Sequence, residues 1–373
     1  GDLCFITPKK WMRAGYGEST RKFFAENTNP KTLIDFAGQK IFESATVDTN
    51  ILLYEKAKNQ GQTQACTVKE NCIDNISVYI KHNTGLSSFD KSDSWVVLSP
   101  IEAEIKQKIE KIGTPLKEWD INIYRGILTG FNDAFIISGE KKDQLIKEDP
   151  KSAEIIRPIL RGRDIKRYGY EFADLYLITT FPSLKINIDK YPAVRDYLKS
   201  FGKRLEQTGE PGSRKKTNNK WFETQDSISY WEDFYKQKIM YSEIVREPQF
   251  YLDKVGKFFP EATTFIMSGK HIEFLYHILH SHAITYFFKT FYAGGGLGEN
   301  GYRYKKAFLE LLPIPLISPE KQLVFINLVR EILQKKAKGS QTEAGERQID
   351  LLVYDLYSLS AQEIAEIEIS KSK

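Results

Sequence analysis

A strong helix signal near residue 100 divides the sequence into two parts with different patterns. Ser99 is a suitable N-cap, Pro100 suits the first helical position, and Glu102 completes a capping box with Ser99. Gly113 provides a stop signal. An apolar stripe at helical spacing is formed by Ile101, Ile105, Ile109 and Ile112. The sequence therefore predicts a helix over 100–112, which we interpret as a hinge helix that opens a second domain.

Residues 1–56 have the alternating pattern of an α/β unit. Short apolar strands are predicted at 3–7, 32–36 and 50–54, with a helix within 8–26. Three strands cannot close a doubly wound sheet, so they indicate one end of a Rossmann-like sheet. Because the first strand begins almost at the first residue, we expect the chain to be a piece of a longer protein.

The sequence after the α/β unit changes character. Residues 57–98 are polar, with one predicted strand at 76–80. From 116 to 315, short strands and turns predict a mixed α+β domain. Its predicted strands are 134–137, 175–179, 238–242 and 264–267. Beyond residue 316 we expect a helical hairpin packed on that domain. Its two helices are 318–336 and one that carries Ile349, Leu352, Val353 and Leu356.

The composition and spacing exclude several classes of protein. With 41% hydrophobic and 28% charged residues the chain has an ordinary globular composition. It has no apolar run of about 18 residues, so we expect no membrane partner. Its three cysteines, Cys4, Cys66 and Cys72, are too few for a disulfide framework and lack the CxxC spacing of a zinc site.

The familiar catalytic patterns are also missing or misplaced. No [DNS]PP[YFW] tetrapeptide occurs, and no strand candidate carries the acidic residues that a metal-dependent nuclease needs. Residues 296–301, GLGENG, fit GxGxxG but do not open a βαβ unit. His277 and His280 lack the glutamate of an HExxH site, and a surface or partly buried helix explains them better. We expect no metal and no cofactor on these residues.

Positive charge is concentrated in one segment. Residues 157–220 hold 15 lysines and arginines against 7 acidic residues, a net charge of +8 in a chain whose total is +5. Such a segment is expected where a protein contacts a polyanion, because each phosphate contact releases condensed counterions. A solvated surface with scattered lysines is the alternative.

Three basic features support nucleic acid. IRPILRGRDIKRY, residues 156–168, places arginines around Gly162, or else forms a charged turn whose arginines pair with Asp164 and Glu171. The segment 203–221 is either a mobile basic loop that orders on phosphates or a solubilising loop. AGGGLGENGYRYKK, residues 293–306, places glycines before basic and aromatic residues. The DNA-contacting candidates are Arg161, Arg163, Lys166, Arg167, Lys203, Arg204, Arg214, Lys215, Lys216, Lys220, Tyr302, Arg303 and Lys305.

These segments resemble a known family. The first part of the chain is similar to the end of the catalytic domain of adenine-N6 DNA methyltransferases, through the segments LCFITPKKWMRAGYGESTRKFF and IDFAGQKIFESATVDTNILLYEK. A later part of the chain resembles the target-recognition domain of TaqI-like enzymes. It begins at RGILTGFNDAFII, includes IIRPILRGRDIKRY and ends at KKAFLELLPIPLISPEKQ. Type IIG restriction–modification enzymes, which are bacterial, have the same order, and the terminal IDLLVYDLYSLSAQEIAEIE resembles their tails. The most specific pieces are TGFNDAF and ILRGRDIKRY.

The resemblance implies an α/β remnant of a methyltransferase sheet, then an α+β target-recognition domain and a C-terminal helical hairpin. The implied boundaries are 1–56 for the end of the catalytic domain, 57–115 for a connector, 116–315 for recognition and 316–373 for the helical region. The parent would transfer methyl from S-adenosylmethionine to adenine N6 in double-stranded DNA, with the base flipped out. Phe42 matches the position that stacks on the flipped adenine, and a core phenylalanine is the alternative.

The same resemblance limits what this chain does alone. The catalytic tetrapeptide and the cofactor turn would lie in a missing N-terminal catalytic half, and Mg²⁺ would matter only if an upstream nuclease exists. We therefore expect sequence-specific DNA recognition by a cytoplasmic protein. We expect neither methyl transfer nor DNA cleavage by this piece of the chain. Two other functions stay open. They are a specificity subunit that docks on a separate methyltransferase and a basic module that binds protein or RNA.

Overall fold

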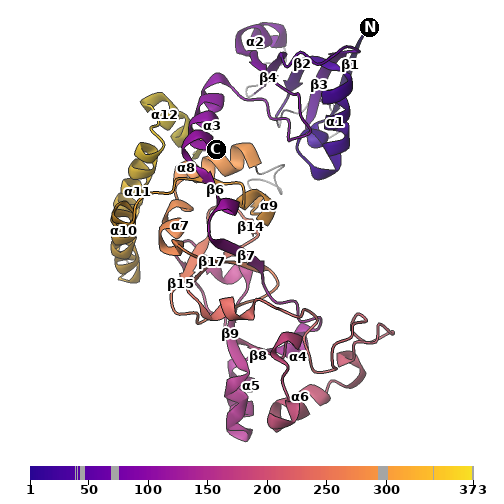
Figure 1. The fold of residues 1–373 in the computed structure, drawn as a ribbon, viewed down its shortest axis with the longest axis vertical. Coiled ribbons are helices and arrows are strands. Elements are labelled where there is room, and N and C mark those ends of the chain that lie inside the picture. Colours follow the sequence, from indigo (N-terminus) through magenta and orange to yellow (C-terminus); the bar gives the residue numbers. More distant parts are fainter. Residues whose placement is uncertain are drawn as a thin grey trace. The chain divides into compact units, whose positions relative to one another are not determined.

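The computed structural model describes residues 1–37, 39, 41–42, 47–68, 75–292, 301–338 and 340–371 (Figure 1). The chain divides into two compact units. Unit 1 comprises residues 1–113, 286–302 and 352–373, and unit 2 comprises residues 114–285 and 303–351. Each unit is therefore assembled from segments that are far apart in the sequence.

Unit 1 contains a five-stranded sheet in the order β1-β3-β2-β4-β5. Its strands are β1 (Asp2–Pro8), β2 (Asn29–Asp35), β3 (Thr49–Glu55), β4 (Thr63–Thr67) and β5 (Gly85–Ser87). The first two strands are each antiparallel to β3, while β2 and β4 are parallel. The predicted strands 3–7, 32–36 and 50–54 are thus confirmed. Within the predicted helical stretch 8–26, only α1 (Glu18–Asn27) is an α-helix.

The strand predicted at 76–80 is wrong, because these residues form helix α2 (Ile76–Asn83). Ile76, Tyr79 and Ile80 have helical spacing and pack against buried Ile34 and Val68. The β-branched run ISVYI suggested a strand, but tertiary packing of this apolar face decides the local structure.

The predicted helix 100–112 is confirmed as α3 (Pro100–Ile112) with its capping box. The Ser99 backbone N–H donates to the Glu102 carboxylate at 2.7 Å, and the Glu102 N–H donates to Ser99 Oγ at 3.4 Å. Within unit 1, Lys108 of α3 forms an ion pair of 2.7 Å with the buried carboxylate of Glu363, on α12 (Ala361–Lys371). The apolar pattern of the sequence did not single out this last helix.

Unit 2 is built on two four-stranded sheets. One has the antiparallel order β15-β13-β17-β7, formed by β7 (Ile121–Arg125), β13 (Lys238–Ser242), β15 (Phe250–Asp253) and β17 (Thr264–Gly269). The other has the order β16-β9-β12-β8, formed by β8 (Ile136–Ser138), β9 (Ile156–Leu160), β12 (Leu175–Ile178) and β16 (Phe259–Pro260). Three predicted strands, 175–179, 238–242 and 264–267, are confirmed.

The fourth predicted strand, 134–137, is correct only in its last two residues. Asn132–Phe135 form the one-turn helix α4, and strand β8 starts at Ile136. Thr129 favours this turn because its hydroxyl bonds the Asn132 side chain at 2.6 Å and accepts from the Phe131 N–H at 3.1 Å.

Short strands and helices complete unit 2. The strand pairs are β6 (Thr114–Pro115) with β19 (Pro313–Ile314) and β10 (Ile165–Lys166) with β11 (Gly169–Tyr170). The helices that lie wholly in this unit are α4, α5 (Gly139–Glu148), α6 (Pro192–Lys199), α7 (Ile272–Ile278), α9 (Lys306–Leu309) and α10 (Pro319–Ala337). Three of the four unit boundaries fall within α8 (His282–Phe287), α11 (Glu343–Leu356) and the strand β18 (Tyr302–Arg303). Strand β18 pairs with β14 (Ile244–Val245).

The predicted helix 318–336 is confirmed as α10. It packs on α7, where the Phe325 and Phe274 rings lie 5.4 Å apart. Gly345, near the start of α11, allows close packing, since a Cβ there would lie 2.7 Å from Ile332 Cγ1 of α10. Among the described residues, no helix is both long and apolar enough to cross a membrane.

Candidate DNA interface

The turn of residues 161–167 is held by an ion pair within it. The Arg161 guanidinium donates to the Asp164 carboxylate from Nη2 at 2.7 Å and from Nε at 2.9 Å. The Arg161 backbone N–H donates to the same carboxylate at 2.9 Å. Burial would raise the pKa of Asp164, but these hydrogen bonds outweigh it and hold the pKa below its ordinary value. The charged-turn interpretation of this segment therefore describes Arg161.

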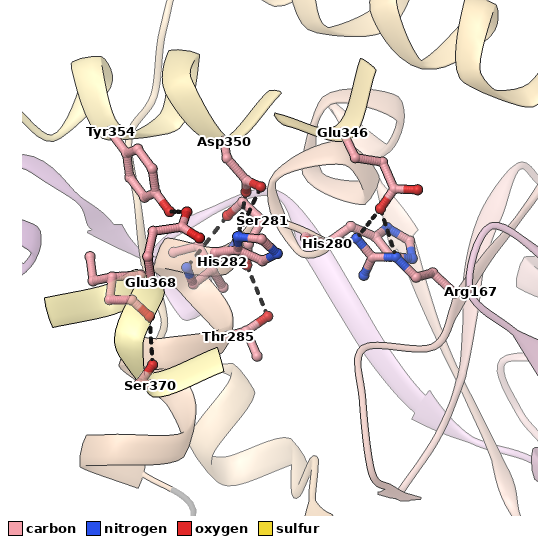
Figure 2. Close-up of polar contacts among 12 residues, drawn as sticks. Arg167, His280, Ser281, His282, Thr285, Glu346, Asp350, Tyr354, Glu368 and Ser370 are labelled. Carbon is pink, nitrogen blue, oxygen red and sulfur yellow. Dashed lines mark hydrogen bonds and ion pairs between the residues drawn. The ribbon is translucent and has the colours of Figure 1, made fainter. Parts of the chain in front are cut away.

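Two further cations of the turn are also paired. Lys166 Nζ lies 3.3 Å from the Glu171 carboxylate. Arg167 donates to the Glu346 carboxylate of α11 from Nη2 at 2.6 Å and from Nε at 3.0 Å (Figure 2). Arg163, in contrast, is exposed. Of the candidates in this turn, Arg163 is therefore the one that presents its side chain most openly to a ligand.

Two of the basic segments meet at the end of β13. Gly162 is buried there, and a Cβ on it would lie 2.7 Å from Ser242 Oγ. The Tyr304 N–H donates to the Glu243 carbonyl at 2.8 Å. The glycine therefore allows the turn 161–164 to approach the strand end beside which residues 303–305 lie.

The segment 302–305 alternates buried aromatic and exposed basic side chains. Tyr302 is 4% exposed, and its ring lies 6.1 Å from that of Phe288. Arg303 and Lys305 are exposed. Residues 293–300, which hold most of the glycine-rich pattern, lie outside the described residues. The geometry makes Tyr302 a core residue and leaves the two cations as the accessible candidates.

Arg214 is the least accessible of the basic candidates, with 4% of its surface exposed. Its side chain crosses beneath the loop 203–221 and donates to four backbone carbonyls, those of Leu205, Thr129, Glu223 and Trp221, at 2.7–3.1 Å. Burial lowers the pKa of the guanidinium to about 10. The guanidinium therefore anchors the loop, a role that the sequence-based list of DNA contacts did not distinguish.

The remaining cations of this loop lie on its surface. Lys203 pairs with Glu210 at 3.1 Å, and the Arg204 guanidinium lies 5.4 Å and 5.5 Å from the ring centroids of Phe131 and Phe201. The other exposed cations are Lys215, Lys216 and Lys220. The structure gives the loop fixed anchors, which the expectation of a mobile loop did not include.

Two other sequence candidates have clear positions. Phe42 is 42% exposed, and its neighbours 43–46 lie outside the described residues. His277 is 3% exposed, and burial lowers its pKa to about 3. His280 stacks on Tyr168 with the ring centroids 4.1 Å apart. The two histidines are thus core residues, and the described part of the chain holds no group of three metal-ligating side chains.

Two family models match separate parts of the chain. Residues 1–42 match the Eco57I restriction-modification methylase, and residues 157–314 match the TaqI-like C-terminal specificity domain. The second match contains all the basic candidates described above. Residues 157–314 are thus similar to the TaqI-like specificity domain, and the chain resembles type II restriction–modification methyltransferases.

Particular relatives agree with this class. The chain is 23% identical to the type II methyltransferase M.BstVI of Geobacillus stearothermophilus, over 98% of this chain and 65% of that protein. It is 26% identical to M.MjaIV of Methanocaldococcus jannaschii, over 61% of this chain and 76% of that protein. The chain therefore spans slightly less than two thirds of M.BstVI.

A solved structure has the same fold. The type IIL restriction–modification enzyme MmeI, determined in complex with DNA, superposes with a TM-score of 0.55 at 12% sequence identity. The match covers 98% of this chain and 48% of that one. At this identity the similarity establishes the shared fold, while function must be argued from the residues.

Proposed function

We propose that unit 2 recognises a specific sequence in double-stranded DNA, as the specificity part of a restriction–modification methyltransferase. The observation that carries this proposal is a set of exposed cations within the residues that match the TaqI-like specificity domain. They are Arg163, Lys203, Arg204, Lys215, Lys216, Lys220, Arg303 and Lys305. Cations of this kind hold phosphates and fix register, while other side chains read the bases.

We propose further that the whole protein methylates adenine N6 with S-adenosylmethionine, and that residues 1–56 end its catalytic domain. The match of residues 1–42 to a methylase and the 65% coverage of M.BstVI support a catalytic half outside residues 1–373. The MmeI structure, which is a complex with DNA, supports DNA as the partner. Domain limits of 57–115, 116–315 and 316–373 remain part of this proposal.

The turn between β1 and α1 does not fit S-adenosylmethionine. A cofactor cradle needs a glycine that leaves room for the ligand, but a Cβ on Gly17 would fall on the Trp11 carbonyl. The Arg21 guanidinium fills the turn, donating to the carbonyls of Trp11 at 2.6 Å, Ala14 at 2.9 Å and Ser92 at 2.8 Å. We therefore assign no step of methyl transfer to these residues.

The proposal is tested by selecting binders of the 373-residue chain from a randomised duplex pool at low and at physiological salt. We expect one short motif to survive the higher salt. Replacing Lys215 and Lys216 with alanine should weaken binding to all sequences alike and reduce the salt slope by about 1 per lost phosphate contact. The matched control is the double alanine variant of Lys147 and Lys151, exposed lysines that precede the matched specificity domain.

The other outcomes separate the alternatives. Salt-sensitive binding with no motif would mean that the chain provides only a basic surface, and it would refute sequence recognition by unit 2. Stronger competition by RNA than by duplex DNA would favour an RNA-binding module. Absence of binding even at low salt would refute the DNA proposal and favour a protein-binding role.

A further inference from the structure

A polar hollow of about 400 Å³ lies beside the anchored loop in unit 2. It is lined by residues 225–230, which carry polar side chains at every position except Ile228. The sequence carries no signal at these residues, because the segment has neither a charge run nor a motif. The chemistry of the lining therefore has to be argued from the structure.

The backbone of this segment is fixed to its neighbours. The N–H groups of Gln225 and Asp226 donate to the carbonyls of Thr129 and Leu128 at 3.0 Å and 3.2 Å. On the other side, Ser183 donates from its N–H to the Ser227 carbonyl at 3.2 Å. These hydrogen bonds hold the backbone of the segment on both sides.

One residue of the segment has a strained conformation. Ile228 has a φ of +51°, which is exceptional for a β-branched residue, and its side chain is 2% exposed in the core of unit 2. Burying Ile228 turns the chain so that its neighbours Ser227 and Ser229 are exposed. Strain of this kind persists where the surrounding structure enforces it, and it is frequent at binding sites.

The side chains of the hollow still have hydrogen-bonding capacity. Those of Gln225, Ser227 and Ser229 make no hydrogen bond within the described part of the chain. The Asp226 carboxylate interacts with the Leu128 N–H and with the Arg125 charge, while its partial burial raises its pKa. An amide, a carboxylate and two hydroxyls therefore converge on one hollow with donors and acceptors left for a ligand.

The hollow lies between an aromatic pair and the basic loop. On one side, the Tyr230 and Tyr124 rings stack with centroids 4.3 Å apart and planes within 3°. On the other, Asn219 of the basic loop donates to the carbonyls of Thr224 and Gln225 at 3.0 Å and 2.9 Å. The loop that carries exposed lysines is therefore attached to the same backbone as the hollow.

We propose that this hollow reads base edges of the recognised DNA sequence, with Gln225 and Asp226 as specificity-determining residues. The inference rests on the proposed function. A glutamine amide can pair bidentately with adenine N6 and N7, and a carboxylate can accept from cytosine N4. The Asp226 carboxylate would repel a phosphate, so the hollow suits bases while the lysines of the adjoining loop suit the backbone.

The test uses isosteric variants of the full chain, Gln225→Glu and Asp226→Asn, in the duplex-pool selection. Each should change the preferred base at one position and lose roughly 5- to 150-fold in affinity for the original motif, the range for one good base contact. The salt slope on random duplex should stay unchanged. The controls are Gln144→Glu and Asp143→Asn on α5, which make the same chemical changes at exposed positions.

The possible failures are distinguishable. If the unmodified chain selects no motif, the proposed function itself fails. If the chain selects a motif that both variants also select with affinities within about twofold, only the inference about the hollow is refuted. Should Asp226→Asn unfold through loss of its charge interaction with Arg125, Gln225→Glu decides alone, because the Gln225 side chain makes no hydrogen bond within the described residues.

Discussion

Replacing Arg214 with methionine should release the loop 203–221 from the backbone carbonyls that hold it. Methionine keeps the apolar stem but removes the donors that hold the carbonyls of Leu205, Thr129 and Glu223 at 2.8–3.1 Å. All three acceptors belong to buried residues. Water can therefore replace the lost donors only after the loop opens.

The magnitude follows from these contacts. A hydrogen bond to a charged group contributes about 1.5–3 kcal/mol, so three of them amount to about 5–9 kcal/mol before compensation. The guanidinium is buried without a carboxylate, as its pKa of about 10 reflects, and methionine removes that cost of charge burial. We therefore expect a net loss of about 3 kcal/mol in the free energy of opening the loop.

Hydrogen exchange of the intact chain measures this loss directly. A change of about 3 kcal/mol corresponds to roughly 150-fold faster exchange of protected amides in residues 203–223, at 1.4 kcal/mol per tenfold. The amides of the strand pair β13 and β17 provide an internal reference, since this pair should keep its protection. Duplex affinity should also fall, because the exposed lysines lose their fixed positions.

A lysine at the same position tests whether Arg214 anchors the loop or contacts a phosphate. Arg214→Lys keeps the charge, but an ammonium on a flexible stem cannot reproduce a planar fork that reaches four carbonyls. It should therefore behave like methionine. If the lysine variant binds normally, while methionine lowers the salt slope by about 1 and leaves exchange unchanged, Arg214 is a phosphate contact and the anchoring argument is refuted.

Three further substitutions test the interior of unit 2. Asp164→Asn should lower the free energy of unfolding, measured in urea at pH 7. The difference between the two proteins should shrink below about pH 4, because the folded state lowers the pKa of Asp164 and this stabilisation is lost as the carboxylate becomes protonated. Lys238→Met should lower the free energy of unfolding by about 3–5 kcal/mol, since it leaves the buried Asp253 carboxylate without its cation. Adding Asp253→Asn should restore much of this loss, because asparagine removes the unpaired charge but keeps an acceptor for the Lys257 and Phe258 N–H groups. Gly126→Ala should lower the melting temperature, because its Cβ would fall on the Glu261 carbonyl.

Local signals account for what the sequence predicted correctly about the fold. The helix α3 is specified by Ser99 and Glu102, three residues apart, and needs no distant partner. Residues 76–80, wrongly predicted as a strand, depend instead on a partner that is distant in the sequence. Its run of β-branched residues suits a strand, but the packing of Tyr79 and Ile80 on Val68 selects a helix. Only the folded chain brings that partner surface into place.

The sequence proposes a region for the candidate site but does not distinguish the roles of its residues. A net charge of +8 identifies residues 157–220 as basic, yet it treats every cation alike. Arg167 pairs with Glu346, 179 positions away in the sequence, and Arg214 satisfies carbonyls that carry no side-chain signature at all. An arginine that binds phosphate and one that organises a loop have the same sequence context. Their burial distinguishes them.

The pairing of cations also limits how strongly DNA binding can depend on salt. Seven candidates are exposed and form no ion pair within the described part of the chain, namely Arg163, Arg204, Lys215, Lys216, Lys220, Arg303 and Lys305. If each of them contacted one phosphate, the logarithm of the binding constant would fall with the logarithm of salt concentration with a slope of about −6, at about −0.9 per contact. A titration that gave a markedly steeper slope would mean that further cations contact phosphates, first among them the paired Arg161, Lys166, Arg167 and Lys203 after leaving their carboxylates. Because Arg161 and Arg167 each hold a carboxylate through two hydrogen bonds, we expect the measured slope to stay within this limit.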